Sequence, residues 1–248
     1  MIISYENMHV SLGGKKILNG VSLQAENEKM TGIIGPNGCG KSTLIKTTFG
    51  ICPYTEGTIR IDSESVSSYS PKKLASMIGY VGQDAACAFD FSVFDVVSMG
   101  LYAREDKTRP AKEVVEEALE ELHITRFRNR SILSLSGGER KMVFIARALV
   151  QNAEVLILDE PTNHLDIRHQ LFLLDYLKKS GKTVLIVLHD LRLAAHYCDR
   201  ICLMSGGQLI AEGEPLKVLS RKHILNVFGI TGNAFTQPDG QLDFSLFG

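Results

Sequence analysis

Nine consecutive residues restrict the fold of this chain more than any other stretch. They are Gly35-Pro36-Asn37-Gly38-Cys39-Gly40-Lys41-Ser42-Thr43, and they match the pattern G-x-x-x-x-G-K-[ST]. Apolar Met30–Ile34 before them predicts a strand, and Thr43–Phe49 after them predicts a helix. Between a strand and a helix, the N–H groups of a glycine-rich turn converge on phosphate oxygens, helped by the positive end of the helix. The stretch therefore predicts a phosphate-binding loop in an α/β fold, rather than an ordinary glycine turn.

Two apolar strands and the side chains that follow them suggest the chemistry. In the phosphate loop, Lys41 is expected to reach the β- and γ-phosphates of a nucleotide, and the Ser42 hydroxyl to bind Mg²⁺. A second apolar run, Val155–Leu158, suits a strand buried on both faces and ends in Asp159-Glu160. Asp159 is expected to hold Mg²⁺ through water, and Glu160 to act as the general base. The pattern predicts hydrolysis of ATP with Mg²⁺.

Composition narrows the class and the compartment. With 248 residues, 44% of them hydrophobic, the chain suits a single domain (1–248) with a sizeable core. A net charge of −1 gives no electrostatic reason to expect a nucleic acid partner. No apolar run approaches the ~20 residues that span a bilayer, and the N-terminus does not resemble a signal peptide. We therefore expect a cytoplasmic protein.

The cysteines agree with a reducing compartment. There are five, an odd number, and no two of them form a C-x-x-C pair. This favours buried thiols that fill small apolar spaces over a disulfide framework or a zinc site. They are Cys39, Cys52, Cys87, Cys198 and Cys202.

The order of elements follows from periodicity and turn residues. Residues 2–34 alternate apolar and polar character and predict a strand, a Gly13-Gly14 hairpin, a second strand and a buried third strand. From Asp84 to about residue 150 the spacing becomes mostly helical, which predicts a helical subdomain inserted into the α/β core. Asp190 predicts the capped start of a helix after the apolar strand Thr183–Leu188. Pro215–Phe228 predicts helical structure, and the tail that follows gives no clear signal.

A second helix start also suits an anion. Leu135-Ser136-Gly137-Gly138-Glu139 opens a predicted helix, so Ser136 and the glycine amides face outward from its positive end. A chain that binds one nucleotide has little use for two such sites. The economical interpretation is that the second site completes the nucleotide site of another copy, and the simpler alternative is a capped helix start.

Six motifs occur here in the order and spacing of the ATP-binding subunits of ABC transporters, which this chain resembles over nearly its whole length. The motifs are Gly35–Thr43, Gln83, Leu135–Glu139, Leu156–Glu160, Asn163–Asp166 and His189. The resemblance implies a P-loop NTPase core with an antiparallel β subdomain and an α-helical subdomain at about 84–150. It also implies that two copies pack head to tail, with ATP between the Lys41 loop of one and Ser136–Gly138 of the other.

The same resemblance implies roles for three further residues. Gln83 would contact Mg²⁺ and sense a membrane partner. His189 would reach the γ-phosphate, and Asp166 would link the two nucleotide sites across the dimer. The partners implied are a second copy, membrane-spanning permease subunits and, indirectly, a substrate-binding protein. The chain would then lie on the cytoplasmic face of the cell membrane.

Longer stretches resemble importers of iron chelates, haem and cobalamin. They are His189–Arg200, Glu212–Pro215 and Val227–Ile230. Zinc, manganese and amino-acid importers share much of this sequence, so a metal-ion importer stays open as an alternative. So does a soluble ABC ATPase acting as a switch on a scaffold, as in iron–sulfur cluster assembly. A small-molecule kinase would leave Ser136–Glu139 without a role.

Three positions depart from the family pattern. Leu12 stands where an aromatic ring would stack on adenine, so weaker base binding is expected, and Leu12→Tyr should tighten it. Gly82 stands where proline is common, which is expected to loosen the loop at Gln83. Cys39 replaces the usual serine, and because Lys41 and a helix N-terminus lie near, its pKa is expected to be lowered. Alkylation there should then block ATP hydrolysis, and ATP should protect.

Overall fold

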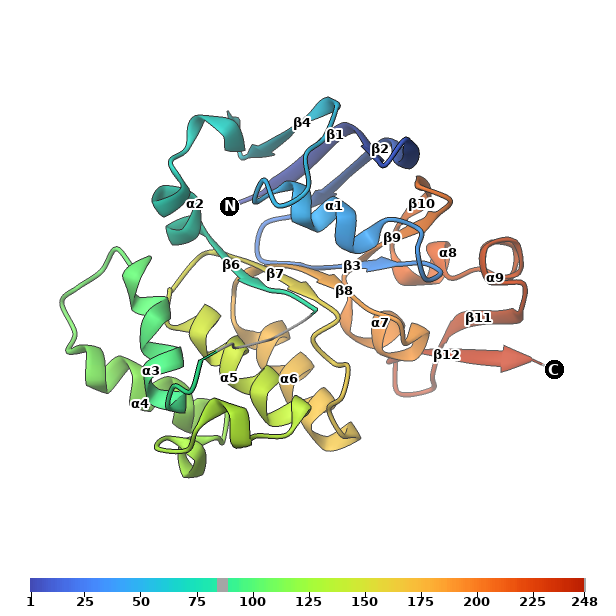
Figure 1. Cartoon of the computed structure of the whole chain (residues 1–248). Coiled ribbons are helices and arrows are strands. Elements are labelled where there is room, and N and C mark those ends of the chain that lie inside the picture. Colours follow the sequence, from blue (N-terminus) through green and yellow to red (C-terminus); the bar gives the residue numbers. More distant parts are fainter. Residues whose placement is uncertain (84–88, 248) are drawn as a thin grey trace. The chain divides into compact units, whose positions relative to one another are not determined.

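The computed structural model describes residues 1–83 and 89–247, which form two compact units (Figure 1). The first unit comprises Met1–Ser68 and Leu177–Gly248, and the second comprises Tyr69–Tyr176. Residues 84–88, where the predicted helical subdomain begins, lie outside the described residues, as does Cys87. The boundary of that subdomain therefore stays a prediction, while the α/β class is confirmed.

An antiparallel sheet forms one part of the first unit (Figure 1). Its strands are β1 (Ile3–Leu12), β2 (Lys15–Ala25), β4 (Glu56–Ile61) and β5 (Glu64–Ser65), in the order β2-β1-β4-β5. The predicted hairpin at Gly13-Gly14 is confirmed by the pairing of β1 with β2. Ile3, Tyr5, Met8 and Val10 of β1 are buried, and a register shift between Tyr5 and Met8 interrupts the alternation of inward and outward side chains.

Parallel strands form the other part of this unit. β3 (Met30–Ile34) pairs with β8 (Thr183–Val187) on one side and with β9 (Arg200–Ser205) on the other. All residues of β3 and β8 are buried, as expected for continuous apolar strands in a parallel sheet. β10 (Gln208–Gly213) closes an antiparallel hairpin with β9, and η1 (Val66–Ser68) is a single 3₁₀ turn.

Two helices follow the carboxyl ends of these strands. α1 (Lys41–Thr47) begins two residues earlier than predicted, because Gly40 already accepts the first helical hydrogen bond, from the N–H of Leu44. α7 (Leu191–Tyr197) is capped by the Asp190 carboxylate, which accepts from two backbone N–H groups as the sequence predicts.

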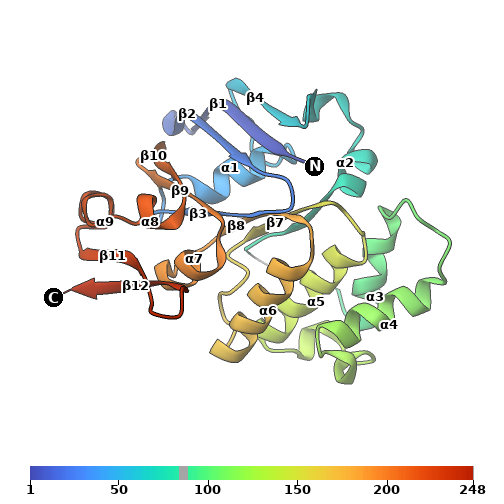
Figure 2. The same ribbon diagram turned by 180° about the vertical axis from the view of Figure 1, so that it is seen from behind.

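The predicted helical segment Pro215–Phe228 is confirmed and is divided into two helices. They are α8 (Pro215–Val218) and α9 (Arg221–Phe228). The Leu219 carbonyl turns away to accept from the N–H of Ala234, and Ser220 then caps α9. A hairpin of β11 (Thr231–Thr236) and β12 (Leu242–Phe247) follows and lies beside α7 (Figure 2).

The second unit is mostly helical and contains one pair of parallel strands, β6 (Ile78–Val81) and β7 (Val155–Asp159). Its helices are α2 (Pro71–Met77), α3 (Val93–Ser98), α4 (Ala111–Glu121), α5 (Gly137–Leu149) and most of α6 (Ile167–Lys179). Short 3₁₀ turns are η2 (Met99–Tyr102), η3 (Thr125–Phe127) and η4 (Ile132–Ser134). Figure 2 shows α3, α4 and α5 packed together, which confirms the helical spacing read from the sequence. In the described part of the chain no helix has the length and apolar character needed to cross a membrane.

Candidate active site

The phosphate loop of the first unit connects β3 to α1. Its residues are Gly35, Pro36, Asn37, Gly38, Cys39, Gly40, Lys41, Ser42 and Thr43. A side chain at Gly35 would place its Cβ 2.1 Å from the Met204 carbonyl oxygen, so only glycine fits against β9. Gly40, the helix N-cap, has a φ of 105°, which L side chains rarely adopt. The sequence pattern is thus explained by close backbone packing.

Lys41 is held inside this loop. Its side chain is buried, and its Nζ donates to the carbonyl oxygens of Gly35 (2.8 Å) and Pro36 (3.0 Å). Ser42 and Thr43 follow in the first helical turn and are half-buried, whereas Asn37 and Gly38 are exposed at the loop tip. A buried cation in a glycine-rich loop with an exposed tip suits a polyphosphate.

The expectation for Cys39 is wrong in direction. Its side chain is only 5% exposed, and this burial raises the pKa of the thiol, outweighing the opposite effect of the nearby Lys41 charge. The sequence argument considered the charge and the helix terminus, but it contained no information about burial. Four described cysteines, Cys39, Cys52, Cys198 and Cys202, are buried free thiols, as composition predicted.

Slow alkylation of Cys39 is the first testable prediction. In a variant whose only cysteine is Cys39, we expect iodoacetamide to react at least about ten times more slowly than with a free thiol at pH 7. Because the reactive species is the thiolate and the pKa is raised, the rate should still climb above pH 9. Urea-unfolded protein is the control and should react at the ordinary rate. Fast labelling of the native protein at pH 7 would contradict the structure.

His189 and Leu12 also belong to the first unit. His189 follows β8, the strand beside β3, and the N–H of neighbouring Leu188 donates to the Ile33 carbonyl oxygen (3.2 Å). The phosphate loop and exposed His189 therefore leave the same edge of the sheet. Leu12 is the last residue of β1 and is 43% exposed, so its side chain is available for an apolar contact.

The acidic pair and Gln83 come from the second unit. Asp159 ends β7 and is fully buried, and Gln83 follows β6, which pairs in parallel through Val81 and Leu158. Glu160 is the next residue, with a φ of 51°, and its Oε2 accepts from Asn163 Nδ2 at 2.6 Å. The carboxylate of Asp159, the amide oxygen of Gln83 and the hydroxyl of Ser42 are oxygen donors of the kind that Mg²⁺ prefers. The donor chemistry fits this ion.

Ser136 begins α5 in a reciprocal capping box. Its Oγ accepts from the Glu139 N–H, while Glu139 Oε2 accepts from the Ser136 N–H and hydroxyl, both at 2.9 Å. Chiefly through the bond from the Ser136 N–H, the pKa of Glu139 is lowered. Gly137 and Gly138 form the first turn of this 13-residue helix. The capped helix start is confirmed, and an anion site at the same helix start stays a prediction.

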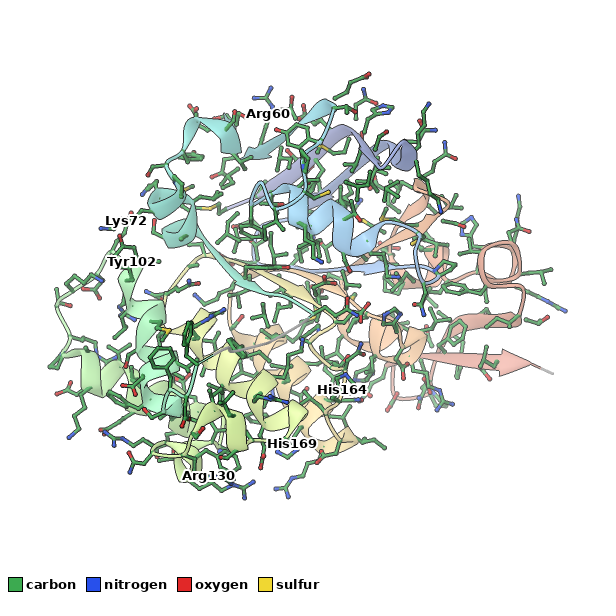
Figure 3. The ribbon with its side chains drawn as sticks, in the orientation of Figure 1. Arg60, Lys72, Tyr102, Arg130, His164 and His169 are labelled. Carbon is green, nitrogen blue, oxygen red and sulfur yellow. The ribbon has the colours of Figure 1, made fainter. Side chains whose placement is uncertain are left out.

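A cavity of about 240 Å³ opens beside this helix start, and Ser136, Gly138, Glu139, His164, Asp166 and His169 are among its lining residues. Figure 3 labels His164 and His169, which both line it. Asp166 accepts from the N–H of His169 (2.9 Å), which is the main reason that its pKa is lowered. The structure thus brings Asp166 close to Ser136–Glu139.

Gly138 should not tolerate a methyl group. A Cβ there would lie 2.6 Å from the His164 carbonyl oxygen, whereas one at Gly137 would lie 3.7 Å from its nearest neighbour, an ordinary contact. We expect Gly138→Ala to lower the ATPase rate at least about tenfold while ATP binding, measured by nucleotide fluorescence, changes less than about twofold. Gly137→Ala is the matched comparison and should lose clearly less. Equal losses would refute the steric argument.

The structure groups the predicted residues within each unit. The first unit brings together the phosphate loop and His189, and the second brings Gln83 to Asp159 and Ser136–Glu139 to Asp166. The sequence analysis missed Lys141, which is buried. A signal was present in the sequence: Lys141 is a charged residue on the same helix face as the apolar residues Ile145 and Ala148.

Comparison with known proteins gives consistent results. The profile of the family described as "ABC transporter" matches residues 18–163, more than half of the chain. The hemin import ATP-binding protein HmuV of Rhodopseudomonas palustris is 37% identical over 242 residues, covering 93% of this chain and 89% of that protein. The cobalamin import ATP-binding protein BtuD of Halobacterium salinarum is 35% identical over 244 residues, covering 96% and 61% respectively.

Solved structures agree with these sequence matches. An ABC transporter of the proposed metal-chelate type, in an inward-facing conformation, superposes with a TM-score of 0.80 at 25% identity. The alignment covers 99% of this chain and 97% of that one. An ATP-binding cassette of another ABC transporter gives a TM-score of 0.78 at 29% identity, with coverage of 90% and 97%.

Proposed function

The chain belongs to the ABC transporter family as an ATP-binding subunit that hydrolyses ATP, and we propose that it powers uptake of haem, an iron chelate or a cobalamin-type compound. The observation that carries this proposal is the similarity, over more than nine-tenths of the chain, to proteins named for hemin and cobalamin import. We also propose one ATPase domain over 1–248 with a helical subdomain at about 84–150.

ATP would be bound and cleaved by the residues that the sequence motifs identify. The backbone N–H groups of Gly38–Thr43 and the Lys41 ammonium would hold the phosphates, and Leu12 would contact the base. Glu160, oriented by Asn163, would take a proton from the attacking water, and His189 would contact the γ-phosphate. Ser42, Gln83 and Asp159 would hold Mg²⁺, whose charge would offset that of the phosphate oxygens.

A second copy would complete each site. Ser136, Gly137 and Gly138 lie at the capped N-terminus of the 13-residue helix α5, where backbone N–H groups can bind an anion, and a cavity opens beside them. We propose that two copies pack head to tail, with Asp166 and Glu139 at the shared surface. ATP binding would then close the dimer, and hydrolysis would open it.

Membrane-spanning permease subunits would supply the pathway, with a substrate-binding protein acting through them. The chain would sit on the cytoplasmic face of the membrane by docking to the permease. This proposal is supported by the import names of the relatives and by the match to a transporter structure over 99% of the chain.

Purification from native membranes tests the function. The chain is tagged in its own cells, membranes are solubilised gently, and the partners are identified by mass spectrometry. A multi-spanning permease in comparable amount supports the proposal, and uptake of haem against cobalamin into vesicles holding that complex identifies the cargo. A soluble scaffold alone would favour the iron–sulfur type of switch. Uptake of free zinc or manganese would favour a metal-ion importer.

A further inference from the structure

A buried lysine connects the two functional segments of the second unit. Lys141 lies on α5, one helical turn beyond Gly137, and its side chain is only 3% exposed. Its Nζ donates to the carbonyl oxygens of Gly82 (3.0 Å) and Gln83 (3.1 Å), just after β6. The helix that begins with Ser136–Gly138 is therefore hydrogen-bonded to the backbone that carries Gln83.

The physical chemistry favours one geometry for this contact. An ammonium taken out of water is costly unless its hydrogens are matched by acceptors. The carbonyl oxygens of Gly82 and Gln83 both accept from Lys141, so movement of either carbonyl would cost the buried ammonium a hydrogen bond. Gly82 supplies one of these two acceptors. The expected looseness of the loop at Gln83 stays a prediction.

Close packing determines how near the backbone of α5 lies to β6. A Cβ at Gly79 of β6 would lie 3.2 Å from the Ala148 carbonyl oxygen on α5, so glycine allows the helix backbone to approach the strand. Lys141 and Ala148 lie on the same helix face, two turns apart. A shift or rotation of α5 would therefore be transmitted through Lys141 to residues 82 and 83.

We propose that Lys141 is a positioning residue for Gln83: it sets the backbone from which Gln83 reaches toward the metal ion and couples that backbone to the helix start at Ser136–Gly138. This inference rests on the proposed roles of Gln83 and Ser136. Binding of phosphate at the helix N-terminus would thereby alter the presentation of Gln83 within the same chain.

The first test is kinetic and uses Lys141→Met, which keeps the length but removes the donors. We expect the Mg²⁺ concentration for half-maximal ATPase rate to rise about tenfold, since Gln83 is presented less well. Lys141→Gln retains an amide donor, so its Mg²⁺ requirement should lie between those of wild type and Lys141→Met. Lys178→Met is the matched control, because it also removes a lysine donor to a backbone carbonyl, that of Tyr197, in the other unit. Its Mg²⁺ requirement should stay within about twofold of wild type.

A double-mutant cycle separates positioning from general stability. In a Gln83→Ala background, Lys141→Met should change the Mg²⁺ requirement less than about twofold, because the residue through which it acts is gone. Equal effects in both backgrounds, with a lowered melting temperature, would show a merely structural role and overturn the proposal.

A second readout needs no hydrolysis. Amide hydrogen exchange of a peptide covering 78–83, measured without nucleotide, should be at least about fivefold faster in Lys141→Met than in wild type or Lys178→Met. Unchanged exchange would overturn the proposal even if the chain is an active importer subunit. Conversely, a wild-type chain that hydrolyses no ATP, alone or with its permease, would refute the proposed function. The exchange result would then still test whether Lys141 positions the backbone at Gln83.

Discussion

Glu160→Gln should reduce ATP hydrolysis about 10²- to 10⁴-fold, the range attributed to a positioned general base. Glu160 is 6% exposed, and the substituted amide oxygen can still accept from Asn163 Nδ2, so the local structure should persist. ATP binding should remain, and an ATP-bound dimer should accumulate, because the step that opens it is blocked. The phosphate release rate and the elution volume with ATP measure both effects.

Glu120→Gln is the control for this substitution. Glu120 is exposed on α4 and carries the same change in charge away from the proposed site, so its ATPase rate should match that of wild type. Turnover by Glu160→Gln at more than about a tenth of the wild-type rate would exclude Glu160 as the base and shift attention to His189.

Lys41→Met should weaken ATP binding about 100-fold, or ~2.8 kcal/mol at a tenfold change per 1.4 kcal/mol. The methionine chain can occupy much of the buried space, but it removes the cation and its two bonds to the loop carbonyls of Gly35 and Pro36. Charge-assisted hydrogen bonds to phosphate are among the strongest that side chains make. Titration calorimetry with ATP gives the affinity directly.

Lys46→Met, in the last turn of the same helix, controls for loss of one positive charge on α1. It should bind ATP within about twofold of wild type. If both variants lost affinity equally, the general positive potential of α1 would matter more than the position of Lys41. A melting curve for each variant separates unfolding from lost contacts.

The sequence predicted most elements because local signals agreed. Gly13-Gly14 marked a hairpin, Asp190 marked a helix start, and the apolar run at Val155 marked a buried strand; the structure contains all three. The break between α8 and α9 was not visible, because it depends on the Leu219 carbonyl accepting from Ala234, fifteen residues later. Helical spacing continues through Leu219, so only a tertiary contact reveals the turn.

In the candidate site, too, some features could be predicted from local sequence and others depend on tertiary packing. The residue types at Lys41, Asp159 and Ser136 could be read from motifs because phosphate and metal chemistry demand them. The burial of Cys39 beneath Gly35, which raises its pKa, depends on how β9 packs against the loop. Lys141 was missed because the acceptors at Gly82 and Gln83 are backbone carbonyls, which every sequence possesses.

The C-terminal hairpin is attached largely through its backbone. Arg192 Nε donates to the Phe244 carbonyl (3.2 Å), His196 Nδ1 contacts the Leu242 carbonyl (3.2 Å), and the Ala234 N–H donates to Leu219. Among the side chains of this hairpin that the structure describes, those of Ala234 and Phe244 are buried. The outward-facing residues of this hairpin can therefore be substituted without loss of these backbone contacts. An epitope or affinity sequence could be inserted there while the attachment to α7 is preserved.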